Sequence, residues 1–467
     1  MLTMFFDRES SIPLYEQLYT YIKTAIEKDE LVANEKLPSK RKLALHLKVS
    51  VITIETAYNQ LMAEGYILSK PKSGFFVLPF IRLTNIPLKH KLSLVTKNIQ
   101  LKKYLFDFKT NQVDELSFPY EKWAKIEKEV ALYTYPANIN KTDYQGVAFL
   151  RQRISEILFE YRGIEANPDS IVIGSGSEQL ISLLVLLLGR ENIFGVEEPG
   201  YMKNYRLYHD YGAKAKTVPL DDYGLDLQLV SDCNIIHVTP SHQFPLGIVT
   251  PIARRMELLN WAYKKESRYI IEDDYDSEFR FSGNPIPALK SLDIHDRVIY
   301  MNSFSKSIAP SLRVSFMVLP DRLINLYHKH YSYFTCSVPV MTQLVLGAFI
   351  KQKEYERHLN RMKNIYKTKR DSLVNCLKNT SFSDRIEIVG EEAGLHFLVK
   401  ITTKTKVSEL VSLAKSQSVR VYSVDEYRAN KTEKSDKKTI IFGYSHLQQN
   451  DFLEATKRLE KAWENNL

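Results

Sequence analysis

From about residue 113 onward, short apolar segments alternate with stretches of helical periodicity. The segments Ser170–Ile173, Asn234–Val238, Tyr269–Ile271 and Arg297–Met301 have the length and composition of buried strands. This alternation predicts a mostly parallel sheet covered by helices, which is an α/β fold. After about residue 340 we expect one long helix, Gln343–Thr368, followed by an α+β tail.

The first 79 residues follow a different pattern. Leu14, Leu18, Ile22 and Ile26 recur at helical spacing, and two serines, Ser39 and Ser50, stand where helix N-caps are expected. Gly65 predicts the end of the third helix, and two short strand-like segments follow it. The expected elements are three helices and a hairpin, at 14–28, Lys40–Leu47, 51 to about 64, Tyr66–Ser69 and Gly74–Val77.

Residues 80–112 are predicted to link the two parts. Six basic residues and no acidic one lie between Arg82 and Lys103. Such a run is typical of a solvated segment; the alternative is a tether that also touches DNA phosphate. The domains expected are therefore 1–79, a basic linker 80–112, and 113–467.

Bulk properties narrow the class of protein. The net charge of +9 permits an acidic partner such as DNA, although residues 1–80 are nearly balanced in charge. The three cysteines are scattered and suggest neither a disulfide framework nor metal ligands, which fits a reducing cytoplasm. The N-terminus does not resemble a signal peptide, and the apolar run Leu180–Leu188 is too short to cross a membrane. We expect a cytoplasmic protein without a metal.

Two helices joined by a tight connection and followed by a hairpin are the parts of a winged helix-turn-helix, in which the second of these helices enters the major groove. The segments PLYEQLYTYIKTAI, LPSKRKLALHLKVSVITIETAYNQLMAEGYI and SGFFV resemble the GntR family of winged-helix repressors over almost all of residues 12–78. The resemblance implies binding of double-stranded operator DNA. A winged helix used only for protein contacts is the alternative.

The GntR resemblance assigns the DNA-facing residues. They lie at the start of the second helix, on the recognition helix and in the wing: Ser39, Lys40, Arg41, Thr53, Lys70, Lys72 and Gly74. Val51 departs from the family, which usually places Arg there, so a direct base contact is in doubt. Tyr58 is expected in the core rather than on the DNA-facing surface.

Two motifs in the second part suggest an anionic, ring-bearing ligand. Gly174–Gln179 joins a strand to a helix, where small residues and free N–H groups suit a phosphate, although any Gly-rich turn of this kind looks similar. Tyr269–Tyr275 ends a buried strand with three consecutive acids, which are costly unless paired. A protonated pyridine nitrogen paired with Asp273 would satisfy this need; metal binding or simple solvation are the alternatives.

Two further motifs suggest covalent capture of such a ligand. Lys306 follows a strand and is flanked by hydroxyls in Ser303–Ser307, a setting that suits a Schiff-base lysine. Seven residues later, Arg313 offers a forked donor matched to phosphate.

These motifs, in this order, resemble the fold-type I aminotransferases over about residues 113–467. The versions EEPGY, TPSHQFPLG, IEDDYDSEFR and SFSKSIAPSLR resemble the MocR/GabR regulators more closely still. The implied fold is a winged helix-turn-helix joined to a pyridoxal-phosphate (PLP) dependent aminotransferase-like domain with large and small subdomains.

The same resemblance gives residue roles for pyridoxal 5′-phosphate. Lys306 would form the internal aldimine, Asp273 would pair with the pyridine nitrogen, and Tyr275 would touch the ring hydroxyl. Tyr201 would stack on the ring, and His242 and Gln243 stand near the ring-contacting Asn of aminotransferases. The remaining cofactor residues, mostly around the phosphate, would be Ser177, Glu178, Ser303, Ser305 and Arg313.

One departure bears on catalysis. Aminotransferases carry an Arg in the late strand that grips the substrate carboxylate, and the matching residue here is Ile441, with Arg428 as a substitute for effector binding. We therefore expect a homodimeric transcription regulator that senses PLP or an amino compound through the aldimine. The alternatives are a working aminotransferase with a DNA-binding appendage and a plain repressor with a dead cofactor fold. Effectors with family precedent are PLP itself, γ-aminobutyrate and a D-amino acid.

Overall fold

The computed structural model describes residues 2–79, 104–140, 143–283, 286–429, 438–464 and 466–467. It divides into two compact units, Met1–Gln100 and Leu101–Leu467. The predicted run of basic residues from Arg82 to Lys103 lies outside the described residues. None of the described helices is long and apolar enough to cross a bilayer.

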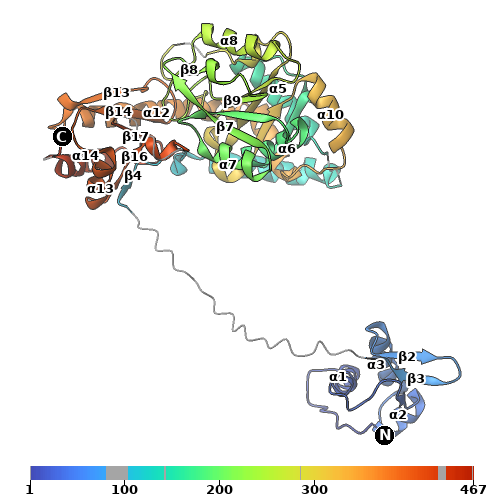
Figure 1. Cartoon of the computed structure of the whole chain (residues 1–467). Helices are drawn as coiled ribbons and strands as arrows, with labels where there is room; N and C mark the ends of the chain where they lie inside the picture. The colour runs from blue at the N-terminus through green and yellow to red at the C-terminus, as the bar shows by residue number, and fades with distance from the viewer. Residues whose placement is uncertain (1, 80–103, 141–142, 284–285, 430–437, 465) are drawn as a thin grey trace. The chain divides into compact units, whose positions relative to one another are not determined.

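The first unit has the predicted helices and hairpin, shown in blue in Figure 1. Ser39 and Ser50 cap the second and third helices, accepting hydrogen bonds from the backbone N–H groups of Lys42 and Thr53 at 3.3 and 3.1 Å. A short strand that was not predicted adds to the hairpin, giving the sheet order β1-β3-β2. The elements are α1 (Leu14–Glu27), β1 (Lys36–Leu37), α2 (Lys40–Leu47), α3 (Val51–Ala63), β2 (Ile67–Lys70) and β3 (Gly74–Val77).

The core of the first unit explains why its helices pack as they do. Leu18, Ile22 and Ile26 of α1 meet Ile54 and Leu61 of α3 in one buried cluster. Tyr58 is fully buried there, as predicted, and its hydroxyl donates to the Pro38 carbonyl at 3.0 Å.

The second unit is built on an eight-stranded sheet, and the predicted strands all lie in it. Most neighbouring strands are parallel, while β12 is antiparallel to both of its neighbours and β8 to β7. In sheet order the strands are β5 (Ile171–Gly174), β12 (Ser315–Val318), β11 (Val298–Ser303), β10 (Tyr269–Asp274), β9 (Ile235–Val238), β6 (Ile193–Glu198), β7 (Lys214–Asp221) and β8 (Gly224–Leu225).

Helices cover both faces of this sheet (Figure 1). Adjacent residues of one strand enter different buried clusters: Ile271 packs with the helices α6 and α7, whereas Ile270 packs with α8. The helices of this region are α4 (Tyr120–Glu129), α5 (Ala148–Arg162), α6 (Ser177–Leu188), α7 (Met202–Asp210), α8 (Ile252–Tyr263), α9 (Phe304–Ser307), α10 (Asp321–Tyr331) and α11 (Val340–Lys351).

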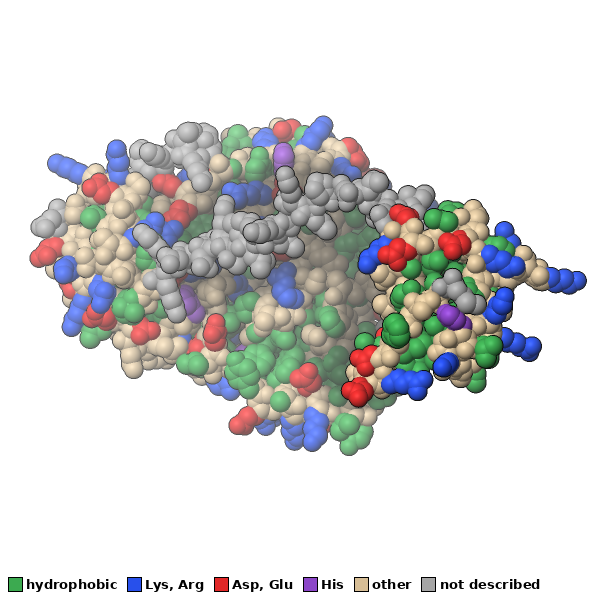
Figure 2. All heavy atoms as spheres, turned by 90° about the horizontal axis from the view of Figure 1, so that it is seen from below, with side chains coloured by type: hydrophobic (Ala, Val, Ile, Leu, Met, Phe, Trp, Pro, Cys, Tyr) green, Lys and Arg blue, Asp and Glu red, His purple; other side chains and the backbone are tan. Residues whose placement is uncertain are grey.

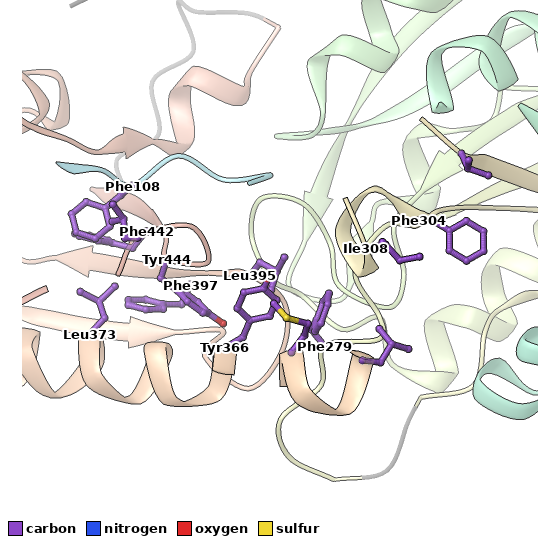
Figure 3. Close-up of a cluster of buried hydrophobic side chains, with 14 of the residues drawn as sticks. Phe108, Phe279, Phe304, Ile308, Tyr366, Leu373, Leu395, Phe397, Phe442 and Tyr444 are labelled. Atoms are coloured by element: carbon purple, nitrogen blue, oxygen red, sulfur yellow. The ribbon is translucent and has the colours of Figure 1, made fainter. Parts of the chain in front are cut away.

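A smaller antiparallel sheet, of order β13-β14-β17-β16, forms the second part of this unit. The long helix α12 runs along the cluster of hydrophobic side chains that joins the two parts, from Phe304 near one end to Phe442 near the other (Figure 3). The elements are α12 (Glu354–Lys378), β13 (Ile386–Val389), β14 (His396–Ile401), α13 (Val407–Ser416), β15 (Val419–Arg420), β16 (Tyr422–Ser423), β17 (Thr439–Gly443) and α14 (Asp451–Trp463).

Two predictions about this unit were wrong. The single helix Gln343–Thr368 is two helices, because Lys353 takes a left-handed backbone conformation, φ 60°, between α11 and α12. Residues 104–112 are not linker: β4 (Phe106–Asp107) pairs with β15, and Phe108 is fully buried beside Phe442 (Figure 3). The folded part therefore begins before residue 113.

Candidate functional site

A cavity of about 250 Å³ opens where β10 and β11 end and α6 begins. Ligands of open α/β sheets bind at this carboxyl edge of the strands. The structure brings all nine predicted cofactor residues to its wall, although they are far apart in the chain: Ser177, Glu178, Tyr201, Asp273, Tyr275, Ser303, Ser305, Lys306 and Arg313.

One end of the cavity is suited to an anion. Gly176 precedes α6 with φ 99°, which leaves the first N–H groups of the helix open to a ligand. The Arg313 guanidinium lies across this turn and donates to the Ser175 carbonyl at 2.9 Å. Ser303 and Ser305, whose hydroxyls are 2.7 Å apart, add further donors. The donor set fits a phosphate group.

Gly176 is required by this close approach. A Cβ atom on Gly176 would lie 2.3 Å from Nη2 of Arg313, so any side chain there would displace the guanidinium.

The three acids of β10 have separate roles. Glu272 accepts hydrogen bonds from the backbone N–H groups of Leu289 and Lys290, both at 2.8 Å, and Asp274 pairs with Arg162 at 2.7 Å. Asp273 points the other way, into the cavity, with His237 Nε2 at 3.3 Å behind it. The acids therefore do not converge on a common metal position, and Asp273 is the one open to a ligand.

Lys306 lies deep in the cavity. Desolvation by burial lowers the pKa of its amine to about 7; the charge of Asp276 opposes this shift and that of Lys109 adds to it. A substantial share of the amine is therefore neutral near pH 7, which is the form that attacks a carbonyl.

Tyr275 is held from behind by a buried pair. Its hydroxyl is 3.0 Å from Nδ1 of His242, which also bonds Asp276 at 3.0 Å. His396 lies close enough to form, with His242 and Asp276, a buried group of potential metal ligands, and its Nε2 bonds the Pro245 carbonyl at 3.0 Å. Gln243 is fully buried, and its side-chain amide donates to the backbone carbonyls of Pro199 and Phe244. Neither His242 nor Gln243 lines the cavity.

Several wall residues were not predicted. Asn111 stands out only by its positive φ of 68°, and Lys203 has no sequence signal. The unpredicted wall residues are Asn111, Lys203, Met301 and Asn302, whereas Gly176, Phe244 and Pro310 lie in predicted motifs that gave them no individual role.

The residue that the aminotransferase resemblance places at the carboxylate-binding position is Ile441, which is apolar. Ile441 is fully buried in a cluster with Leu398 and Val424. Arg428 does not line the cavity, and its guanidinium lies 3.5 Å from Asp425. The described cations on the cavity wall are Lys203, Lys306 and Arg313.

The predicted DNA-facing residues lie on the first unit, where Figure 2 shows Lys and Arg side chains projecting from the edge that carries the wing. Arg41 and Lys72 are exposed. Lys40 is engaged within the unit, because its ammonium bonds Glu55 at 2.5 Å. Thr53 is half-buried and shares a 2.8 Å hydrogen bond with Ser50.

The remaining members of this set lie in the wing. The Lys70 ammonium lies 4.8 Å from the Phe76 ring centroid. Gly74 has φ 111°, and a Cβ there would meet Lys36 Cε at 3.3 Å.

Fold and cavity together define a class of protein: an aminotransferase-like unit with a lysine-bearing cavity, on a chain that also carries a winged helix. Residues 103–434 match the family described as aminotransferase class I and II, and residues 14–77 match the bacterial regulatory proteins of the gntR family. The aminotransferase match identifies pyridoxal 5′-phosphate as the cofactor.

Relatives carry the same combination over the whole chain. The uncharacterized HTH-type transcriptional regulator YdeL of Bacillus subtilis is 36% identical, covering 99% of both chains. The probable rhizopine catabolism regulatory protein MocR of Rhizobium meliloti is 29% identical over 98% of this chain and 95% of its own. The chain belongs to this family of MocR-type, PLP-dependent DNA-binding transcription regulators.

Solved structures share the fold of the second unit. The kynurenine aminotransferase of Pyrococcus horikoshii superposes with a TM-score of 0.69 at 23% identity, covering 78% of this chain and 92% of that one.

Gly176→Ala is expected to weaken PLP binding at least about tenfold, because the new Cβ would displace the Arg313 guanidinium, and a charge-assisted phosphate contact is worth about 1.5–3 kcal/mol. Gly212→Ala is the matched control: Gly212 also has a positive φ, 82°, but its Cβ would make ordinary contacts with Arg190, at 3.6 Å from Cδ and 4.0 Å from Nε. Absorbance titration with PLP measures both. Equal affinities of the two variants for PLP would contradict the assignment of the Gly176 turn and Arg313 as the phosphate site.

The rate at which cofactor-free protein gains visible absorbance after mixing with PLP should rise with pH through about 7. The folded-state pKa of Lys306 is lowered, so its reactive neutral form grows above that pH instead of near 10.5, the ordinary value for lysine. Stopped-flow absorbance at a series of pH values gives the midpoint. A midpoint near that of free lysine would show that burial does not depress this pKa.

Proposed function

We propose that the cavity holds the cofactor in one orientation. Arg313, Ser177, Ser303 and Ser305 would bind its phosphate, and Asp273 would face the pyridine nitrogen. The bound group supplies an electrophilic carbon that Lys306 can hold covalently. The observation that carries the proposal is that Lys306, Asp273 and Arg313 line one cavity.

The aromatic residues would fix the ring. Tyr201 lines the cavity and lies edge-on to Phe244, with ring centroids 5.9 Å apart. Tyr275 would meet the ring hydroxyl, with its own hydroxyl held by His242.

We further propose that residues 1–79 bind the operator and that the second unit senses the ligand. Arg41, Lys70, Lys72 and the capped start of α2 at Ser39 would contact the DNA. A homodimer would suit an operator with two half-sites, because a two-fold dimer presents the same surface twice. Residues 80–103 would then connect the two functions.

The effector would be PLP itself or a small amino compound. Arg428 remains a proposed contact for the acid group of such a compound, since its segment packs against the loop that leads to Tyr201. The N–H of Ala429 bonds Glu198 at 2.9 Å, and the N–H of Gly200 bonds the Tyr427 carbonyl at 3.1 Å.

Turnover of common α-amino acids is expected to be negligible. Two of the three described cations on the cavity wall lie at its anion end and the third is Lys306, so among the described wall residues no cation is left to bind a substrate carboxylate. Ile441, in place of the Arg of aminotransferases, is buried away from the cavity. Release of keto acid in steady state measures this directly. A rate of about 1 s⁻¹ or more, ordinary for an enzyme, would favour the alternative of a working aminotransferase.

DNA binding and cofactor binding should be separable by mutation. Arg41→Ala is expected to weaken operator binding and to lower the slope of log affinity against log salt by about 0.9, while leaving the visible absorbance of bound cofactor intact. Lys306→Ala should lose that absorbance and still bind the operator. Fluorescence anisotropy across a salt series and a visible spectrum give the two readouts.

Lys28→Ala is the control for Arg41→Ala, because Lys28 is exposed on the same unit but lies at the end of α1. If Arg41→Ala binds as tightly as Lys28→Ala at every salt concentration, Arg41 does not contact the DNA.

A further inference from the structure

A carboxylate lies at the anion end of the cavity. Glu178 is the second residue of α6 and lines the cavity with Lys203 and Arg313. Oε1 of Glu178 accepts a hydrogen bond from the Lys203 ammonium, and Oε2 lies 3.5 Å from Nη2 of Arg313. Both cations at this end therefore already have an anionic partner within the chain.

This arrangement adds little to folding. The side chains of Glu178, Lys203 and Arg313 are 39%, 46% and 50% exposed, and ion pairs in such settings contribute about 0–1 kcal/mol. The hydrogen bond from Lys203 lowers the pKa of Glu178, so the carboxylate is charged at neutral pH. A phosphate that enters the anion end of the cavity would be repelled by this carboxylate and would compete with it for the same two cations.

We infer that Glu178 is an internal competitor for the cofactor's phosphate. It holds Lys203 and Arg313 when the cofactor is absent and weakens the cofactor's binding when it is present. Because binding is weakened, the fraction of protein that carries the cofactor changes with the cofactor concentration instead of staying saturated. A site responds in this way only at concentrations near its own dissociation constant. This inference rests on the proposed placement of the phosphate at Arg313.

Glu178→Gln tests the inference, since it removes the charge and keeps the shape. PLP should bind the variant at least about tenfold more tightly, which corresponds to about 1.4 kcal/mol. The gain should shrink as salt is added. Pyridoxal, which lacks the phosphate, should bind the variant and the parent equally. Absorbance titration and equilibrium dialysis supply the dissociation constants.

Asp232→Asn is the matched control, because Asp232 pairs with Lys216 at 2.7 Å with similar exposure but lies away from the cavity. Unchanged or weaker PLP binding in Glu178→Gln, or an equal gain for pyridoxal, would overturn the inference and leave cofactor binding established. If the parent protein does not bind PLP at all, the proposed function fails and the inference fails with it.

A second observation concerns the DNA-facing unit. The first turn of α3 presents two branched apolar side chains: Val51 is 42% exposed and Ile52 is 73% exposed. The Lys40–Glu55 pair joins the first turn of α2 to this helix, and the exposed Arg41 is the next residue of that same turn. A basic residue that can meet phosphate thus accompanies the apolar pair.

We propose that Val51 and Ile52 select thymine through its methyl group. The start of this helix meets base edges in the major groove, where the thymine methyl is the apolar group on display. Against any other base edge, these side chains would leave a donor or acceptor without a partner, which costs free energy.

Deoxyuracil scanning of the footprinted operator tests this proposal, because it removes only the methyl group. At least one thymine in each half-site should lose about fourfold in affinity when replaced, the value of one buried methyl group. The double variant Val51→Ala, Ile52→Ala should abolish that loss. An operator without a sensitive thymine, or sensitivity that persists in the double variant, would overturn the proposal.

Discussion

The carboxyl edge of β10 and β11 is the constraint on which the rest of the cavity depends. These strands are parallel, with Asp273 opposite Met301 in register, so the loops after them begin side by side. Lys306 follows one strand and Tyr275 the other, and the turn before α6 supplies the anion end. Burial at this edge also lowers the pKa of Lys306, because the surrounding sheet excludes water from the amine.

The described cavity wall combines the nine residues proposed to hold the cofactor with no cation beyond Lys203, Lys306 and Arg313. Glu178 adds a charge that opposes tight retention of a phosphate, while Ile441, in place of the Arg of aminotransferases, is fully buried and offers no cation to a substrate. A protein that binds its cofactor reversibly and turns over little has the properties of a sensor. In such a sensor the first unit would bind DNA, and the ligand would alter that binding only if it favours one conformation of the chain over another.

Local signals made much of this predictable. The caps Ser39 and Ser50, the alternation of strands and helices, and the residues at strand ends were all readable from short stretches of sequence. Features set by distant contacts were not readable. The backbone of Phe108 is hydrogen-bonded to Arg420 of β15 and Gly443 of β17, which are more than 300 residues away in the chain. Lys353 interrupts a continuous helical pattern between α11 and α12, which both pack into the same hydrophobic cluster.

The candidate site shows the same division. Lys306 and Asp273 carry a motif, whereas Lys203 reaches the cavity from a separate helix and Asn111 from a segment predicted as linker. Lys40 has the sequence context of a DNA contact, yet Glu55, fifteen residues later, takes its ammonium. A charge in a motif therefore indicates a site, but its partner has to be found in three dimensions.

The most direct measurement is the affinity of the protein for its operator as a function of PLP concentration, made in parallel on the parent and on Lys306→Ala. The operator is first identified by selecting the fragments of the source genome that the protein binds. If the second unit senses PLP through Lys306, PLP should change the parent's affinity at concentrations near its dissociation constant for the cofactor, and should leave that of Lys306→Ala unchanged. An affinity that is independent of PLP in the parent, or that responds equally in Lys306→Ala, would contradict this sensing role.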